Sequence, residues 1–305
     1  MALKTGLIGA GVFGGYHAGK IAESEIAEFT GVFDPDPARA KELASKYGVE
    51  AFGTQASLLA EADAVIIACP ATYHAETVRE AIAAGCHVLV EKPLALTGDE
   101  ASSLARAADA AKRVLQVGHQ ERLVLKAMGL FDLPETPVKI EAWRESPPAP
   151  TGRAGDVSVI FDLMIHDLDM VACLMGKAAT VDGEGAIVHS GHIDEAKALL
   201  GFPDGARATV SASRAADERR RSMRLVFENG EIDIDFLTRH VKNSTPFEVR
   251  ADVSQALSDP FGAADHAFFA ACAGEGPVLV PGHEAAEAVR VAEALETTIK
   301  KTNGA

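Results

Sequence analysis

Lys92, Asp162 and His166 are the residues whose types and spacing could carry proton-transfer chemistry. Lys92 ends an apolar run at 87–91, and an ammonium group there could polarise a substrate hydroxyl and stabilise the charge that develops on its oxygen as hydride leaves the carbon. Asp162 and His166 are four residues apart in a predicted helix at 156–175, so their side chains share one helix face. An imidazole with a pKa of about 6.5 suits proton removal from an alcohol, and Asp162 could orient a neighbouring sugar hydroxyl.

Each of these assignments has a plainer alternative. Lys92 by itself could be a surface lysine. An Asp-His pair on a helix is often an ordinary surface pair, and Asp167 and Asp169 show that this helix is acidic. The chemistry therefore depends on a cofactor and on elements that position these side chains.

A glycine-rich turn near the start of the chain predicts a dinucleotide-binding site. Gly9, Gly11 and Gly14 form the pattern G-x-G-x-x-G, with Val12 and Phe13 between the last two glycines, after an apolar run and before a helical pattern. The first glycine allows a tight turn, the second lets the backbone approach a pyrophosphate, and the third lets helix and strand pack closely. The N-terminus of the following helix is expected to stabilise the phosphates.

Asp34 follows Gly14 by twenty positions and closes the next apolar run. In a dinucleotide site this carboxylate is expected to accept hydrogen bonds from the ribose hydroxyls and to repel a 2′-phosphate, which favours NAD over NADP. Pro35-Asp36-Pro37 supplies no arginine beside it, although Arg39 lies close enough in sequence to act on a phosphate. The alternative interpretation of Asp34 is a turn residue or a helix N-cap.

Composition and charge exclude several classes of protein. The chain has 305 residues, 48% of them hydrophobic and 24% charged, which suits two globular domains. Its net charge of −15 argues against binding nucleic acid or an anionic membrane, so an anionic substrate must meet a local basic cluster. The apolar runs are too short to span a bilayer and no signal sequence begins the chain, so we expect a cytoplasmic protein.

Neither a disulfide framework nor a metal site is expected. The cysteines show no C-x-x-C pair and are interpreted as reduced thiols: Cys69, Cys86, Cys173 and Cys272. His189 and His192 flank a predicted turn at Gly191 without a further ligand pattern.

The pattern of elements predicts an α/β protein with a domain boundary near residue 120. Residues 1–120 alternate strands and helices, which is typical of a parallel, doubly wound Rossmann domain. Its strands are expected at 3–9, 29–34, 64–68, 87–91 and 114–118, and its helices include 37–47, 75–84 and 99–112.

Residues 121–305 are expected to form a substrate-binding and oligomerisation α/β domain with an open, mainly antiparallel sheet. Asn229-Gly230 predicts a type I′ hairpin. The helix at 156–175 precedes strands with alternating apolar residues, at 180–189, 193–202, 206–214, 221–228 and 231–237. Two helices close the chain, at 262–273 and 283–300.

Ligands of a doubly wound sheet bind beyond the carboxyl ends of its strands. Pro70 and His74 come after one predicted strand, and Glu91 and Lys92 come after the next. Together with the glycine turn, these residues are the predicted cofactor site.

These motifs together resemble the glucose-fructose oxidoreductase, inositol dehydrogenase and rhizopine-catabolism family, Gfo/Idh/MocA. The resemblance rests on the glycine turn, on Glu91-Lys92-Pro93 and on the D-x-x-x-H pair of Asp162 and His166, and it covers nearly the whole chain. It implies a Rossmann domain followed by an α/β domain whose open sheet often mediates oligomer contacts, hence a homodimer or homotetramer. Lys92, Asp162 and His166 fall on the family's catalytic positions, and the Lys92–Pro93 bond is often cis in relatives.

A narrower resemblance points to the branch that acts on nucleotide-linked amino sugars, which includes UDP-N-acetylglucosamine 3-dehydrogenases. It rests on the stretch at 117–122, on Trp143-Arg144-Glu145-Ser146-Pro147 and on Arg153. Relatives usually continue Arg122 into Phe-Asn-Pro, whereas this chain continues into Leu123-Val124-Leu125. This branch implies oxidation of the 3-hydroxyl of a UDP-linked N-acetylamino sugar, a precursor of lipid A or of surface polysaccharide.

A diphosphate-bearing substrate would need charge-assisted donors, and Arg122, Arg144 and Arg153 lie near the expected site. They are therefore predicted to bind substrate together with Lys92, Asp162 and His166. Further candidate donors to the diphosphate are Arg214 and the arginines at 219–221. The main interpretation of 219–221 is a solvated loop before a strand.

Other functions remain open at this stage. The chain could be a free-sugar or inositol dehydrogenase, or an oxidoreductase that holds its cofactor tightly. It could also be a catalytically inert NAD-binding regulator, although such proteins tend to lose the lysine or the histidine. Lys92 and His166 could exchange the role of proton acceptor.

Overall fold

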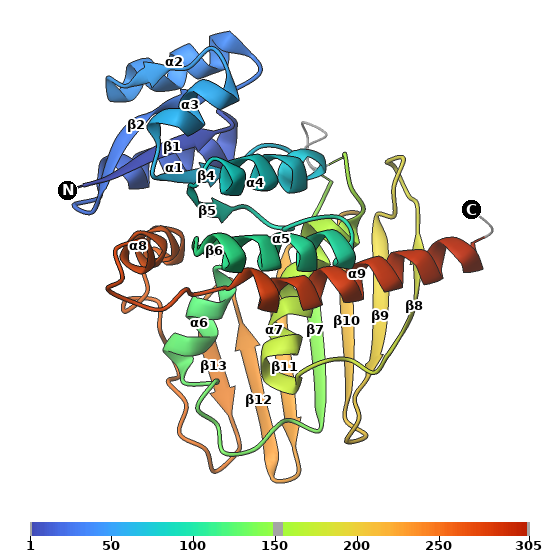
Figure 1. Cartoon of the computed structure of the whole chain (residues 1–305). Helices are drawn as coiled ribbons and strands as arrows, with labels where there is room; N and C mark the ends of the chain where they lie inside the picture. The colour runs from blue at the N-terminus through green and yellow to red at the C-terminus, as the bar shows by residue number, and fades with distance from the viewer. Residues whose placement is uncertain (1, 149–154, 304–305) are drawn as a thin grey trace. The chain divides into compact units, whose positions relative to one another are not determined.

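The computed structural model describes residues 2–148 and 155–303. The chain divides into two compact units, the first comprising 1–119 and 261–286 and the second comprising 120–260 and 287–305. The sequence placed everything after residue 120 in the second domain, whereas the structure returns 261–286 to the first unit. Figure 1 shows the two units in the colours of the chain.

A six-stranded parallel sheet forms the first unit, with the order β3-β2-β1-β4-β5-β6, so the predicted doubly wound α/β architecture is confirmed. The strands are β1 (Leu3–Ile8), β2 (Ala27–Phe33), β3 (Glu50–Ala51), β4 (Ala64–Ile67), β5 (His87–Val90) and β6 (Leu115–Val117). Because β1 pairs with both β2 and β4, the strand order reverses at β1, and ligands of such sheets bind beyond its carboxyl end.

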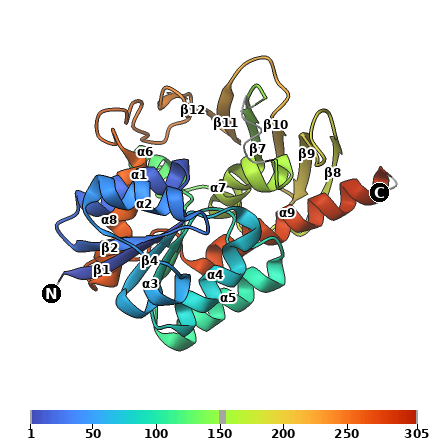
Figure 2. The same cartoon turned by 90° about the horizontal axis from the view of Figure 1, so that it is seen from above.

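Helices cover both faces of this sheet, as Figure 2 shows: α1, α2 and α8 on one face and α3, α4 and α5 on the other. Their bounds are α1 (Val12–Ala22), α2 (Pro37–Tyr47), α3 (Gln55–Glu61), α4 (His74–Ala83), α5 (Gly98–Ala111) and α8 (Pro260–Cys272). The strands β4, β5 and β6 are buried almost throughout, which explains their continuous apolar runs.

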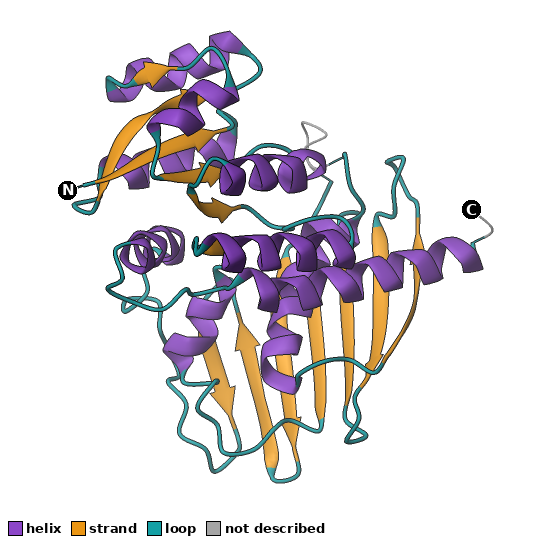
Figure 3. Cartoon of the chain, in the orientation of Figure 1, coloured by secondary structure: helices purple, strands orange, loops and turns teal. Residues whose placement is uncertain are grey.

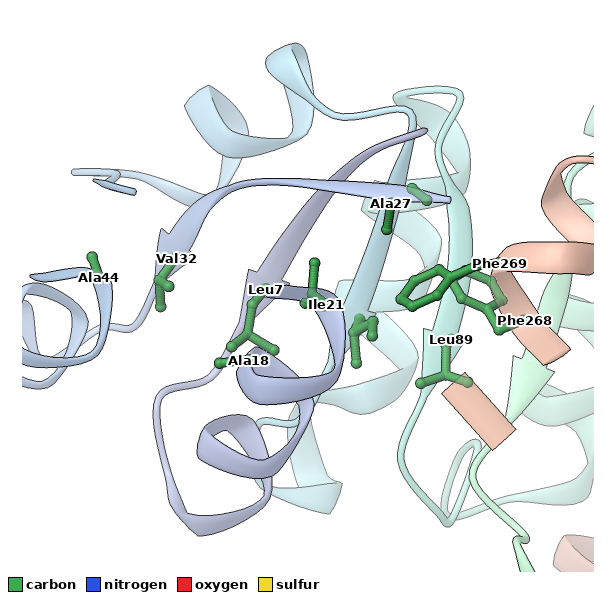
Figure 4. Packing of buried hydrophobic residues seen from close by; sticks show 11 residues of the cluster. Leu7, Ala18, Ile21, Ala27, Val32, Ala44, Leu89, Phe268 and Phe269 are labelled. Atoms are coloured by element: carbon green, nitrogen blue, oxygen red, sulfur yellow. The ribbon is translucent and has the colours of Figure 1, made fainter. Parts of the chain in front are cut away.

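Phe268 and Phe269 explain why α8 belongs to the first unit. Both side chains are buried in the core cluster that includes Leu7 of β1, Ile21 of α1 and Leu89 of β5. Figure 4 shows the two rings beside Leu89. Burying two aromatic rings is a large apolar gain, so a segment late in the chain completes a core begun by the first hundred residues.

The second unit contains a seven-stranded sheet with the order β13-β12-β11-β7-β10-β9-β8. Only the β7–β10 pair is parallel, so the expected open, mainly antiparallel sheet is confirmed. The strands are β7 (Lys139–Glu145), β8 (Thr180–Ala186), β9 (Glu195–Gly201), β10 (Arg207–Ser213), β11 (Arg220–Phe227), β12 (Gly230–Asp235) and β13 (His240–Asn243).

One face of this sheet is covered by helices, as Figure 3 shows. They are α6 (Glu121–Met128), α7 (Ile165–Met175) and the part of α9 (Gly282–Thr302) that lies in this unit. A Cβ atom on Gly183 of β8 would come within 2.5 Å of Leu295, so glycine lets α9 approach the strand closely. None of the helices in the described residues is both long and apolar enough to span a membrane.

The hairpin predicted at Asn229-Gly230 is present between β11 and β12, but the predicted type I′ turn is wrong. Phe227 pairs with Gly230, so Glu228 and Asn229 are the central residues, and neither has a positive φ. Gly230 itself has a φ of 138°. Glycine therefore supplies the unusual backbone angle at the first residue of β12 instead of inside the turn.

Candidate active site

The glycine turn of the first unit has the shape that a pyrophosphate requires. Gly9 has a φ of 101°, and a Cβ atom on Gly14 would lie 1.9 Å from the carbonyl oxygen of Gly9, so both positions need glycine. A Cβ atom on Gly11 would meet nothing within 4 Å, and helix α1 begins at the next residue, Val12. Open space beside a helix N-terminus fits the phosphates of a dinucleotide.

Asp34 lies directly beside this turn. One of its carboxylate oxygens accepts a hydrogen bond of 2.8 Å from the backbone N–H of Ala10, and the other accepts one of 2.8 Å from Asp36. Asp36, and not Asp34, is the N-cap of α2, because its side chain accepts from Ala38. The guanidinium of Arg39 lies 3.3 Å from Asp34. Each carboxylate oxygen of Asp34 still has lone-pair capacity for a ribose hydroxyl.

His74 joins the end of β4 to the turn that carries Lys92. Its Nδ1 lies 2.6 Å from the carbonyl oxygen of Pro93, and its Nε2 lies 2.9 Å from that of Cys69. The ring is buried, and burial lowers the pKa of His74. Both ring nitrogens therefore face backbone carbonyls, and the predicted role of His74 as a cofactor ligand is not supported. Pro70 precedes the short 3₁₀ turn that leads into this helix.

Glu91 faces the interior of the first unit. His17 of α1 stands between two carboxylates, with Nδ1 2.7 Å from Asp265 of α8 and Nε2 3.3 Å from Glu91. Glu91 also accepts from the backbone N–H of Lys92 at 3.3 Å. Burial alone would lower the pKa of His17, but the charges and hydrogen bonds of Asp265 and Glu91 raise it to about 9. This charged triad connects α1 and α8 to the Lys92 turn, whose Lys92–Pro93 bond is cis.

Asp162 and His166 belong to the second unit. Asp162 lies in a π-helical segment, Ile160–Met164, and His166 lies in the first turn of α7. Such widened turns are rare and occur often at functional sites. The expected single helix at 156–175 is therefore two differently wound segments.

A carboxylate that the sequence analysis did not identify lies against His166. Nδ1 of His166 is 2.8 Å from Oε2 of Glu121, the first residue of α6, and their side chains are only 12% and 16% exposed. The two side chains form an ion pair whenever His166 is protonated. Burial alone would raise the pKa of Glu121, but the charges of His166 and Arg144 hold it well below its usual range. Glu121 is thus an ionised acceptor.

This contact determines which nitrogen of His166 can act as a base. A lone pair on Nδ1 would repel an ionised carboxylate at 2.8 Å, so the neutral ring carries its hydrogen on Nδ1. Nε2 is then the nitrogen whose lone pair can take a proton. A carboxylate behind the imidazole also stabilises the imidazolium that proton transfer forms.

Arg144 and Arg122 are occupied by carboxylates of their own unit. Arg144 of β7 lies 2.7 Å from Asp167 and 2.9 Å from Glu121. Arg122 makes two bonds of 2.7 Å to Asp169. Both guanidinium groups are buried, so their predicted role in binding a diphosphate is not supported by this geometry.

Arg144 instead positions Glu121, because it holds the carboxylate oxygen that does not face His166. Arg214, a further candidate, pairs with Asp194 at 2.7 Å. Arg153 lies outside the described residues. Within residues 2–148 and 155–303, no cluster of His, Cys, Asp and Glu has an arrangement that could hold a metal ion.

Two family models cover most of the chain. Residues 3–119 match the oxidoreductase family with an NAD-binding Rossmann fold, and residues 126–233 match the GFO/IDH/MocA C-terminal domain. The chain belongs to the Gfo/Idh/MocA oxidoreductase family. It is therefore an NAD-dependent oxidoreductase, as the glycine turn and Asp34 predicted.

Individual relatives agree with this assignment. A UDP-N-acetylglucosamine 3-dehydrogenase from Acidithiobacillus ferrooxidans is 36% identical over 78% of this chain and 76% of its own length. The solved structure of that enzyme has a TM-score of 0.90, with 32% identity over 99% of both chains. An inositol 2-dehydrogenase from Rhizobium meliloti is 29% identical over 71% of this chain and 70% of its own length.

The buried charge of His17 predicts a pH-dependent stability. A pKa raised to about 9 contributes stability that is complete below about pH 6.5 and is lost as the pH rises through 9. We expect the unfolding free energy of the native protein to fall by up to ~3 kcal/mol over this interval, measured by urea titration at several pH values. His17→Gln flattens this slope, whereas His240→Gln, at an exposed histidine, preserves it. If the unfolding free energy depended on pH equally steeply in the native protein and in His17→Gln, the raised pKa of His17 would be contradicted.

Glu121→Gln tests the pair with His166. Loss of the carboxylate disfavours the imidazolium, so oxidation is expected to slow at least about tenfold and the acid limb of the kcat profile to move to lower pH. Three other charged groups that act on Glu121, from β7, α7 and β11, are unchanged in this variant: Arg144, Asp167 and Arg221. Glu135→Gln, an exposed position, is the control with the same charge change. If Glu121→Gln kept the native kcat and the acid limb of its pH profile did not shift, Glu121 would have no role in proton transfer.

Proposed function

We propose that this protein oxidises the 3-hydroxyl of a UDP-linked N-acetylamino sugar with NAD as the oxidant. The acid–base part of the proposal rests on one observation, the imidazole of His166 held at 2.8 Å by the ionised carboxylate of Glu121. The substrate is supported by similarity, since a UDP-N-acetylglucosamine 3-dehydrogenase aligns with 99% of this chain.

In this proposal each side chain has a separate task. Nε2 of His166 takes the proton of the hydroxyl group, and Glu121 stabilises the resulting imidazolium. Lys92 polarises the same oxygen and stabilises the charge that develops as the carbonyl forms. Asp162 orients a neighbouring hydroxyl of the sugar. Bound NAD supplies a hydride acceptor, so the products are a 3-keto sugar and the reduced cofactor.

The residues around the cofactor divide between direct and indirect roles. The backbone from Gly9 to Gly14 binds the pyrophosphate, and Asp34 binds the ribose. Glu91 and His74 act through the Lys92 turn, which they connect to α1, α8 and β4. NAD is preferred over NADP because Asp34 would repel a 2′-phosphate, and because Arg39 already faces Asp34 and Asp36.

A second candidate function is oxidation of inositol or of a free sugar. Similarity to the inositol 2-dehydrogenase favours it, as does Leu123-Val124-Leu125 in place of the Phe-Asn-Pro expected of the nucleotide-sugar branch. We also propose a cytoplasmic, homodimeric or homotetrameric enzyme that supplies a lipid A or surface-polysaccharide precursor. The compartment, the oligomeric state and the role in supplying a precursor are proposed because the chain resembles the branch that acts on nucleotide-linked amino sugars.

A substrate panel followed at 340 nm tests this proposal. We expect reduction of NAD with UDP-N-acetylglucosamine or its uronic acid, and none with glucose or myo-inositol. Lys92→Ala is expected to lower the rate about 100-fold or more, because an electrostatic stabiliser of the developing charge is lost. Lys41→Ala, at an exposed lysine of α2, leaves the rate unchanged.

Other results would redirect the assignment. Turnover of myo-inositol or free glucose alone would replace the nucleotide sugar with the second candidate. NAD binding without turnover of any of these compounds would contradict a dehydrogenase of either kind and favour the inert regulator.

A further inference from the structure

Arg221 lies beside Arg144 on the helix-covered face of the second unit's sheet. The two residues are paired across β11 and β7, and the next pairs on this face, Met223 with Ala142 and Leu225 with Ile140, are all buried. Because side chains alternate along a strand, Arg221 shares the face of these residues. The charges of Arg144, Glu121 and Asp167 all act on its guanidinium.

The two arginines have different neighbours. Arg144 contacts Asp167 and Glu121, whereas no carboxylate oxygen lies within 4.0 Å of the Arg221 guanidinium in the parts of the chain that the structure describes. Burial lowers the pKa of Arg221, and so does the charge of Arg144, while Glu121 acts in the opposite direction. Like charges on directly opposed residues of an antiparallel pair are destabilising. An anion bound to Arg221 would remove this cost.

The neighbouring arginine behaves differently. Arg220 extends to the other face of the sheet, where its guanidinium lies 4.0 Å from the ring centroid of Trp143. This is a cation–π contact within the protein. Of these two adjacent arginines, Arg221 is the one that shares a sheet face with Arg144 and interacts with the charge of Glu121.

We propose that Arg221 binds an anionic group of the substrate, a phosphate oxygen of a nucleotide diphosphate or a carboxylate on the sugar. The inference rests on the proposed function and supplies the cation that an anionic substrate needs in a protein of charge −15. Arg122 and Arg144 already pair with Asp169, Asp167 and Glu121, which neutralise their charges. The planar guanidinium matches either oxyanion with paired N–H donors.

Arg221→Gln and Arg221→Lys test the inference, with Arg220→Gln as the control on the opposite face of the same strand. If Arg221 binds the diphosphate, we expect Arg221→Gln to raise the KM for both UDP-N-acetylglucosamine and its uronic acid at least about tenfold, while kcat changes less than about threefold. If Arg221 binds the carboxylate, only the KM for the uronic acid rises by this factor. Arg221→Lys keeps the charge and is expected to give an intermediate KM. Arg220→Gln is expected to keep the native values.

Binding measurements separate the two anions and do not require turnover. Calorimetry with UDP alone, in the presence of NADH, reports the diphosphate, and free N-acetylglucosaminuronic acid reports the carboxylate. Weaker binding of either compound to Arg221→Gln than to Arg220→Gln supports the inference and names the anion. Native affinity of the folded Arg221→Gln protein for both compounds, or no binding of either compound to the native protein, would overturn it. If the native protein binds UDP but oxidises no compound of the substrate panel, the proposed reaction is wrong, whereas the inference about Arg221 still stands.

Discussion

Both units are organised by the cost of burying charge. An ion removed from water must be paired and hydrogen-bonded, and His17, Arg122 and Arg144 each meet a carboxylate from another element of the chain. His17 meets Asp265 across 248 residues, and Arg122 meets Asp169 across 47. Such pairs contribute little net stability compared with apolar packing, but breaking one partner is costly. They therefore fix the positions of the elements that carry Lys92 and His166.

In the proposed mechanism, the cofactor-binding residues belong to the first unit and the proton-accepting histidine belongs to the second. In the first, the glycine turn and Asp34 lie at the carboxyl end of β1 and β2, where a doubly wound sheet binds its ligands. In the second, Arg144 holds Glu121, and Glu121 holds His166. A side chain locked by buried partners loses little freedom when it acts, which is the physical basis of preorganisation. Arg122 serves the same unit by fixing α6 to α7 through Asp169.

Sequence patterns predicted what depends on local order. Gly9 and Gly14 are required by backbone geometry, and the strands of the first sheet are recognisable as short apolar runs, so both could be predicted. The two-residue strand β3 was missed because it is too short to show a pattern. The strand β7 was missed because prolines on both sides made its segment resemble a loop. The return of 261–286 to the first unit depends on where Phe268 and Phe269 find a core, which no local pattern encodes.

The candidate site was predicted through its resemblance to a family, and its supports were not. Glu121 entered the sequence analysis only as one residue of the stretch 117–122, since nothing in its sequence neighbourhood indicates contact with a residue 45 positions later. Arg122 and Arg144 were assigned to substrate because a sequence cannot reveal that Asp169 and Asp167 occupy them. Only the folded chain shows which charges are already neutralised.

The transfer of hydride from the sugar ring is the central claim, and isotope labelling tests it most directly. UDP-N-acetylglucosamine carrying deuterium at C3 would be incubated with the protein and NAD, and the reduced cofactor analysed by mass spectrometry. The account predicts deuterium in the NADH and a 3-keto sugar without it. Formation of unlabelled NADH, with deuterium retained at C3 of the product, would contradict the account.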